Sequence, residues 1–479
     1  AATPPISTEG TILSDPEPLG FIENRPFDDI KIGDSAELIR TLTAQDIDAF
    51  AVVSGDVNPA HVDVEFAEGD VFHKVIAHGM WGGALISNVL GTQLPGPGTI
   101  YLEQSLRFLK PVGVGDTVVV RVEVIEREEE KHRLTLSCTC TNGAGTPVIE
   151  GIAKVIAPDR KIRRPRMTMP DLVLHKHGKA HGDMLVRAQA IDPMATAVAH
   201  PCDASSLEGA VQARDAGVLA PILVGPEQRI RSVAVENALD ISGLDIVDTP
   251  HSHAAAEAAV DLVRTGAARA LMKGSLHTDE LMSAVISKTG GLRTERRMSH
   301  VYVMDVPTYP KPLIITDAAI NIAPDLETKA DIIQNAIDLA RAIGIDVPKV
   351  AILSAVETVN PRMQSTLDAA ALCKMADRGQ ITGGRLDGPL AFDNAISMRA
   401  VATKSIVSPV AGQADILVAP DLEAGNMIAK QLMYLAGAEA AGVVLGARVP
   451  IILTSRADDA KTRIASAAIA ALYSAAQRP

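Results

Sequence analysis

Short apolar runs alternate with Ala-rich helical segments over most of the chain after residue 176. Helical segments such as 254–263 and 329–342 separate most of these strand-like runs. The runs are Ile222–Val224, Ala270–Met272, Val301–Met304, Leu313–Thr316, Val350–Leu353, Ile416–Ala419 and Val449–Leu453. Strands that alternate with helices predict a doubly wound, mostly parallel sheet with helices on its faces.

The stretch from Ile416 to Asp459 shows this pattern most clearly. One apolar run ends at Pro420, a helical segment follows, and a second apolar run ends in Ser455 and Arg456. Ligands of open α/β sheets bind outside the carboxyl ends of the strands, so this hydroxyl and guanidinium are well placed for an anionic substrate. The alternative is that Ser455 caps the next helix, whose first turn would hold Asp458.

The segments DLEAGNMIAKQL and LAGAEAAGVVLGARVPIILTSRAD resemble the C-terminal signature of the phosphate acetyltransferase and phosphate butyryltransferase family. The resemblance extends over most of residues 185–479. It implies an acyltransferase domain at 177–479, with one lobe at about 177–304 plus 447–479 and a second lobe at about 305–446. The active cleft would lie between the lobes. Ser455 would stabilise the transition state, and Arg456 would contact phosphate or coenzyme A (CoA).

Two further segments resemble the same family. LMKGSLHTDELMSAV places Lys273 and Ser275 at a strand end, as substrate-binding candidates. GLRTERRMSHV supplies Arg293 and Arg297 for anion binding, unless this cluster is only a solvated face. The context of GLRT is closer to the butyryl type than to the acetyl type.

The chain departs from the acetyl type at one position. The carboxylate thought to act as the base lies about two helical turns beyond the Ser-Arg pair, and Thr462 occupies that position here. Asp458, with Asp459 as the alternative, would replace it one turn earlier. If neither does, the domain is a non-catalytic module that senses acyl-CoA and supports oligomerisation.

The N-terminal part of the chain follows a different pattern. Thr43 with Asp46 predicts a helix start and Gly55 its end, and Pro59 indicates a loop over 56–61. A segment of small and apolar residues after His78 predicts a buried helix. Strand-like runs follow at Thr99–Phe108, Asp116–Glu126, Arg133–Thr141 and Val148–Ala157. One buried helix followed by antiparallel strands predicts an α+β domain, a sheet wrapped around that helix.

The segments SGDVNPAHVD, IAHGMWGGALIS and GTIYLEQSLRFLKPVGVGDTV resemble the hotdog-fold (R)-specific enoyl-CoA hydratases of the MaoC-like group, over residues 25–157. Hydration of an enoyl thioester needs a base, an acid and donors for the enolate oxygen. The resemblance makes Asp56 and His61 the catalytic pair, gives the Gly79 amide to the oxyanion hole and places Ser87 near the Asp. A bulky Trp81 favours short acyl chains. Without the resemblance, the Asp and His would be ordinary polar side chains on the surface or would cap a helix.

Composition limits the remaining possibilities. A net charge of -13 and a pI near 5.4 argue against nucleic acid or an anionic membrane as partner. The 4 cysteines lack metal-ligand spacing, so we expect no metal and no permanently bound cofactor. A Pro-rich arm at 1–24 and a linker at 158–176 bound the first domain. No apolar run of about 18 residues occurs, and we expect a cytoplasmic homo-oligomer, a dimer or larger.

The combined prediction is a bifunctional enzyme. One half would interconvert trans-2-enoyl-CoA and (R)-3-hydroxyacyl-CoA, with short chains favoured. The other would exchange an acetyl- or butyryl-type acyl group between CoA and phosphate. Acyl-CoA, enoyl-CoA and phosphate are then substrates rather than resident cofactors.

Overall fold

The computed structural model describes residues 20–167, 179–453 and 460–477. The chain divides into two compact units, Ala1–Leu174 and His175–Pro479, and the division falls within the linker expected at 158–176. Three of the predicted site residues, Ser455, Arg456 and Asp458, lie outside the described residues.

The first unit is built on a five-stranded antiparallel sheet of order β2-β4-β5-β6-β3. Its strands are β2 (Ser35–Thr41), β3 (Ile100–Phe108), β4 (Thr117–Glu128), β5 (Arg133–Asn142) and β6 (Pro147–Ile156). Alternate residues of β4, from Val118 to Val124, are buried, as the sequence pattern predicts. The four strands after residue 98 were predicted. The edge strand β2 was not, because its residues are mostly exposed and show no apolar alternation.

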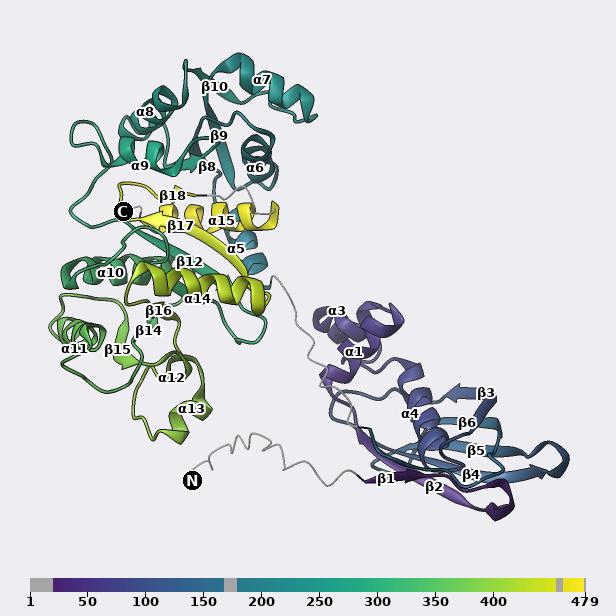
Figure 1. Ribbon diagram of the computed structural model, residues 1–479. Helices are drawn as coiled ribbons and strands as arrows, with labels where there is room; N and C mark the ends of the chain where they lie inside the picture. The colour runs from purple at the N-terminus through teal and green to yellow at the C-terminus, as the bar shows by residue number, and fades with distance from the viewer. Residues whose placement is uncertain (1–19, 168–178, 454–459, 478–479) are drawn as a thin grey trace. The chain divides into compact units, whose positions relative to one another are not determined.

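Helix α4 (Gly79–Thr92) is the buried helix of this unit, and it packs against β4 and β2 (Figure 1). Its apolar residues Trp81, Ile86 and Leu90 lie in the core. Glycine allows a close approach at one point, because a Cβ at Gly82 would lie 2.2 Å from Cδ1 of Ile149 on β6. The predicted arrangement of a sheet around one helix is therefore confirmed.

Short helices precede α4. Helix α1 (Ala44–Ser54) begins at the predicted capping box of Thr43 and ends at Gly55, whose φ is 75°. The predicted loop at 56–61 is wrong in its second half, because α2 (Pro59–Val62) begins there. Proline is excluded from a helix interior but is well suited to the first helical position, where its missing N–H has no partner to lose. Helix α3 (Val64–Gly69) follows.

Segments expected in the N-terminal arm and in the linker are paired in the structure. Strand β1 (Phe21–Glu23) runs antiparallel to β7 (Arg163–Pro165). The buried side chain of Asn24, which follows β1, is bonded to the residues that precede β7. It donates to the Arg160 carbonyl at 2.8 Å and accepts from the Ile162 amide at 2.7 Å. The folded unit thus extends beyond residues 25–157.

The second unit contains one continuous sheet of eleven strands, of order β10-β9-β8-β11-β18-β17-β12-β13-β16-β14-β15. Neighbours are parallel except for the pairs β12–β13, β12–β17 and β17–β18. The strands are β8 (Met194–Ala199), β9 (Leu219–Gly225), β10 (Asp245–Asp248), β11 (Ala270–Lys273), β12 (Ser299–Asp305), β13 (Leu313–Thr316), β14 (Lys349–Leu353), β15 (Arg385–Leu390), β16 (Ile416–Val418), β17 (Glu439–Leu445) and β18 (Ile451–Ile452).

Helices cover both faces of this sheet, which explains why its strands are continuous apolar runs. One face holds α5 (Lys179–Gln189), α6 (Ala204–Asp215), α7 (Glu227–Glu236), α10 (Leu326–Ala342), α11 (Gln364–Asp377) and α15 (Ala460–Ala476). The other holds α8 (Ser252–Arg264), α9 (Thr278–Ile286), α12 (Phe392–Ile396), α13 (Met398–Thr403) and α14 (Leu422–Leu435). The doubly wound, mostly parallel architecture is as predicted.

The boundary expected near Asp305 falls at the end of β12, in the interior of the sheet. The two halves share one sheet and one core on the face that carries α10 and α15. Among the helices of the described residues, none is long and apolar enough to cross a membrane.

Candidate active sites

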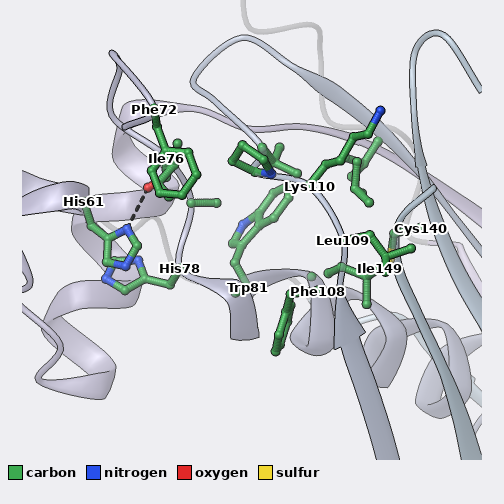
Figure 2. A pocket seen from close by; sticks show the side chains of 17 residues that line it. His61, Phe72, Ile76, His78, Trp81, Phe108, Leu109, Lys110, Cys140 and Ile149 are labelled. Carbon is green, nitrogen blue, oxygen red and sulfur yellow. Dashed lines mark hydrogen bonds between the residues drawn. The ribbon is translucent and has the colours of Figure 1, made fainter. Parts of the chain in front are cut away.

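A cavity of about 290 Å³ opens beside the N-terminus of α4 in the first unit. Figure 2 shows His61 and His78 on one side of it, Cys140 and Ile149 on the other, and Trp81 between them. Its walls are mostly apolar, and burial raises the pKa of the Cys140 thiol to about 12, which keeps this thiol neutral. The cavity thus suits an apolar chain with polar chemistry confined to one end.

His61 is half-buried on α2 and lines this cavity. Its Nδ1 lies 2.9 Å from the carbonyl oxygen of Ile76. Because a carbonyl can only accept, the proton of the neutral ring is on Nδ1. Nε2 therefore carries the lone pair and is the atom available as a base.

Asp56 lies beside His61 in an exposed turn between α1 and α2. Its Oδ1 accepts from the amide of Asn58 at 3.2 Å, and its own amide donates to Ser54 Oγ at 3.2 Å. One side-chain polar atom from each of Asp56, His61 and His78 lies within 4.8 Å of the others. The structure thus brings the predicted pair together and adds His78 to it.

These three side chains are close enough to raise the question of a metal. His78 Nε2 donates a hydrogen bond to the backbone oxygen of Asp56 at a distance of 2.9 Å. His78 Nδ1 is buried and has no hydrogen-bond partner among the described residues. Because Nε2 of His78 carries the proton of its hydrogen bond to Asp56, it cannot coordinate an ion at the same time, and the ring serves as a support beside Asp56 and His61.

Two other predicted residues lie on α4. Gly79 lines the cavity at the first helical position, where backbone amides lack helical partners, and a Cβ there would lie 3.0 Å from the Phe108 ring. Ser87 is exposed, and within residues 20–167 the structure shows no hydrogen bond between it and Asp56. The expected position of Ser87 near Asp56 therefore stays a prediction.

The sequence prediction underestimated two features of this cavity. His78 directly precedes α4, but its side chain makes no capping hydrogen bond to this helix. Phe108 and Ile149, which complete the walls, come from β3 and β6. Sequence spacing carries no signal for such contacts between strands and helix. Trp81 lines the cavity as expected and is 7% exposed.

In the second unit, Lys273 is the last residue of β11, and Ser275 follows just beyond its carboxyl end. The amide of Ser275 donates to the carbonyl of His200 at 2.8 Å, and His200 Nδ1 lies 3.2 Å from the Ser275 carbonyl. His200 follows β8, which is the parallel neighbour of β11. These residues therefore lie at the carboxyl ends of neighbouring parallel strands, where an α/β protein binds its ligand.

A cavity of about 470 Å³ in the same unit is lined by Arg293, Arg296 and Arg297. Arg296 Nη1 lies 2.5 Å from Asp338 Oδ2, which neutralises it. For Arg293 and Arg297 the described residues contain no ion pair. Lys273 and Ser275 are not part of this cavity's lining. The structure thus brings together the two predicted anion-binding arginines, but it does not place Lys273 and Ser275, the other two substrate-binding candidates of this unit, in the same cavity.

Asn321 also lines this cavity, and buried Asp317 holds it in place. Asp317 Oδ2 accepts from the backbone amide of Asn321 at 2.9 Å and from its Nδ2 at 2.6 Å. Hydrogen bonds from Thr328 lower the pKa of nearby Asp325, and the positive charge of Arg297 makes a smaller contribution in the same direction. The sequence prediction did not include Asp317 or Asn321.

The fold and the sites define two classes of protein in one chain. The first unit is a hotdog domain with a cavity at its helix end, and residues 31–143 match the MaoC like domain family. The second is a doubly wound α/β protein with arginines around a cavity, and residues 252–471 match the phosphate acetyl/butaryl transferase family.

Relatives of known identity extend this finding. Phosphate acetyltransferase of Rhizobium meliloti is 63% identical over 295 residues, 62% of this chain and 93% of that protein. Phosphate butyryltransferase of Clostridium acetobutylicum is 42% identical over 61% of this chain and 98% of that protein. A branched-chain phosphotransacylase structure from Enterococcus faecalis superposes with a TM-score of 0.53 at 30% identity, over 59% of this chain and 99% of that one. The chain belongs to the phosphate acetyl/butyryl transferase family.

The identities also correct one sequence interpretation. The GLRT segment was taken as closer to the butyryl type, yet the acetyltransferase relative is the more similar of the two. A four-residue context carries less information than similarity over the whole domain.

Proposed function

We propose that the second unit transfers an acetyl group between CoA and phosphate. The observation that carries this proposal is the 63% identity to a phosphate acetyltransferase over 93% of that protein. A phosphate oxygen attacks the thioester carbonyl carbon, a C–O bond forms and the C–S bond breaks. The products are acetyl phosphate and CoA, whose thiolate takes up a proton.

The arginine cavity supports the phosphate-binding part of this reaction. Arg293 and Arg297 have guanidinium groups free of ion pairs within the described residues, and a guanidinium can meet two phosphate oxygens at once. Lys273 and Ser275 would contact the CoA thioester at the end of β11. The proposed roles of Ser455, Arg456 and Asp458 come from the resemblance: transition-state hydrogen bonding, anion contact and proton transfer.

We propose a second activity for the first unit, the reversible hydration of a trans-2-enoyl-CoA to an (R)-3-hydroxyacyl-CoA. The observation that favours it is the pair Asp56 and His61 beside a mostly apolar cavity. The oxygen of water forms a bond with Cβ, the base takes one of its protons, and a proton is delivered to Cα. Charge accumulates meanwhile on the thioester oxygen.

In this proposal each task belongs to a residue or amide at the polar end of the cavity. His61 Nε2 carries the lone pair that accepts the proton of water, because Nδ1 is engaged with Ile76. Asp56 lies on the other side of the proposed water. The free amides at the start of α4, including that of Gly79, stabilise the enolate oxygen. Trp81 limits the cavity to short acyl chains.

Both activities are tested on one purified sample of the full chain. We expect phosphate-dependent release of CoA from acetyl-CoA and hydration of crotonyl-CoA. His61→Ala should abolish hydration alone, and Ser455→Ala should abolish transfer alone. Normal hydration without any transfer would favour the sensing module for the second unit. Neither reaction as proposed uses a resident cofactor, and light scattering of the same sample would test the predicted homo-oligomer.

A further inference from the structure

The ring of His78 occupies an unusual position between the two residues of the proposed pair. It is 3% exposed, although it directly precedes α4 and lines the cavity. Its side chain does not cap the helix. Because this imidazole is buried and does not cap α4, we look for its role in its contacts with residues outside that helix.

The first of these contacts is with the main chain of Asp56. His78 Nε2 donates to the Asp56 carbonyl oxygen at 2.9 Å. Residues 52–59 are all exposed, so the turn that carries the carboxylate has little packing of its own. The bond to a buried ring therefore ties this exposed turn to the body of the first unit.

The second contact is with the ring of His61. The two imidazole rings lie 4.1 Å apart at an angle of 36°, and Phe50 packs on His78 with a centroid distance of 5.0 Å. His61 is also held by its bond to the carbonyl of Ile76. The His78 ring packs against one face of His61, and the hydrogen bond to Ile76 holds one edge of it. Together these contacts fix the direction in which His61 Nε2 points.

The tautomer of His78 follows from the same contacts. Nε2 must carry the proton because its partner is a carbonyl, and Nδ1 is buried with no partner in the part of the chain that the structure describes. The ring thus has no free donor to offer a substrate. Its contribution is geometric, because it holds the carboxylate-bearing turn and the base at a fixed separation.

We propose that His78 is a positioning residue for hydration, which aligns Asp56 through its backbone and His61 through its ring. This inference rests on the proposed hydration activity. It assigns His78 no contact with the reacting atoms. A displacement of about 1 Å in an active site can cost roughly 10²-fold in rate, so loss of this alignment should appear in kcat rather than in KM.

Three variants of the full chain separate the two contacts. His78→Phe keeps a ring for stacking but removes the donor to Asp56. His78→Gln keeps an N–H donor at the corresponding distance, whereas the amide of His78→Asn is one bond too short. His73→Gln is the matched control, since His73 is exposed in the same unit and is absent from the cavity lining.

We expect kcat for crotonyl-CoA to fall roughly 10²-fold in His78→Phe and His78→Asn, with KM within threefold of the wild type. His78→Gln should recover at least tenfold, and His73→Gln should match the wild type. Trp81 is the single tryptophan of the chain and lies in this cavity, so its emission reports the fold of the first unit in each variant. Acetyl transfer by the second unit provides the concentration control.

Unchanged kcat in His78→Phe, or a loss that appears only in KM, would overturn the inference. If His78→Phe does not fold, as shown by shifted Trp81 emission, the comparison of His78→Asn with His78→Gln decides: equal rates contradict a role for the hydrogen bond. A wild-type chain that does not hydrate crotonyl-CoA would instead refute the proposed function itself.

Discussion

Gly425 lies in α14 at the point where this helix crosses the main chain of Asp317. A Cβ at Gly425 would lie 2.2 Å from the carbonyl oxygen of Asp317. Since Cβ contacts below 3.0 Å are essentially never found, the helix and the Asp317 segment would have to separate by at least 0.8 Å, the difference between these distances. The obstructing atom belongs to the backbone and cannot rotate away.

The expected cost of Gly425→Ala follows from two opposing terms. Overpacking of a tight interior costs about 3 kcal/mol at the upper end, and the better helix propensity of alanine returns about 1 kcal/mol. The free energy of unfolding of the second unit should therefore fall by roughly 2 kcal/mol. Because Asp317 holds Asn321 at the arginine cavity, KM for phosphate should rise as well.

Gly182→Ala is the matched control, because it makes the same substitution in helix α5 where nothing lies within 4 Å of the new methyl group. This variant should be more stable than the wild type by about 0.5 to 1 kcal/mol and should keep its KM for phosphate. Urea unfolding followed by circular dichroism, together with acetyl-transfer kinetics, measures both effects. Equal stabilisation of the two variants would refute the steric reasoning.

Three further outcomes can be measured. Trp81→Leu should raise the kcat/KM for C8 relative to C4 enoyl-CoA by at least tenfold, since each newly buried methylene contributes about 0.8 kcal/mol; an unchanged ratio means that Trp81 is not the wall. Arg297→Ala should raise KM for phosphate at least roughly tenfold, while Arg296→Ala, whose side chain Asp338 already holds, should change it less than about threefold. Burial lowers the pKa of His300 to about 4, below its ordinary value of 6.5. Between those values the unfolded chain binds a proton that the folded chain does not, so this histidine lowers stability as pH falls from 6.5 to 4.5, by about 2 kcal/mol. Urea unfolding at both pH values should show a smaller loss in His300→Gln, and an equal loss would contradict this assignment.

Local chemistry was sufficient to predict several elements of the fold. The capping box at Thr43 and the glycine at 55 define α1 without help from the rest of the chain. The alternation from Val118 to Val124 defines β4, because one face of that strand is buried against α4. Strand β2 was missed since it lies at the sheet edge, where even the residues that face the core are only half-buried. Helix α2 was missed because proline was interpreted only as a helix breaker.

The site residues, like the elements of the fold, include some that a local motif predicts and some that only the folded chain brings together. Asp56 and His61 are five residues apart, so a motif can contain both. His78 reaches them across a fold that sequence spacing does not describe, and the support that Asp317 gives to Asn321 becomes visible only beside the arginine cavity. The continuity of the second unit's sheet across both expected lobes depends on β12 pairing with β17, whose sequence separation is more than 130 residues. Such pairings are set by the whole chain.

The charges around the two cavities explain how an acidic chain can use anionic substrates. The net charge of -13 repels phosphate at long range, so attraction has to be local. In the arginine cavity Arg296 pairs with Asp338, whereas Arg293 and Arg297 make no ion pair within the described residues, and Glu295, Glu327 and Asp331 also line the cavity. The two unpaired guanidinium groups can each meet phosphate oxygens directly, so attraction depends on these contacts rather than on the net charge of the lining. The cavity in the first unit is mostly apolar instead, which suits the uncharged acyl chain of the proposed substrate.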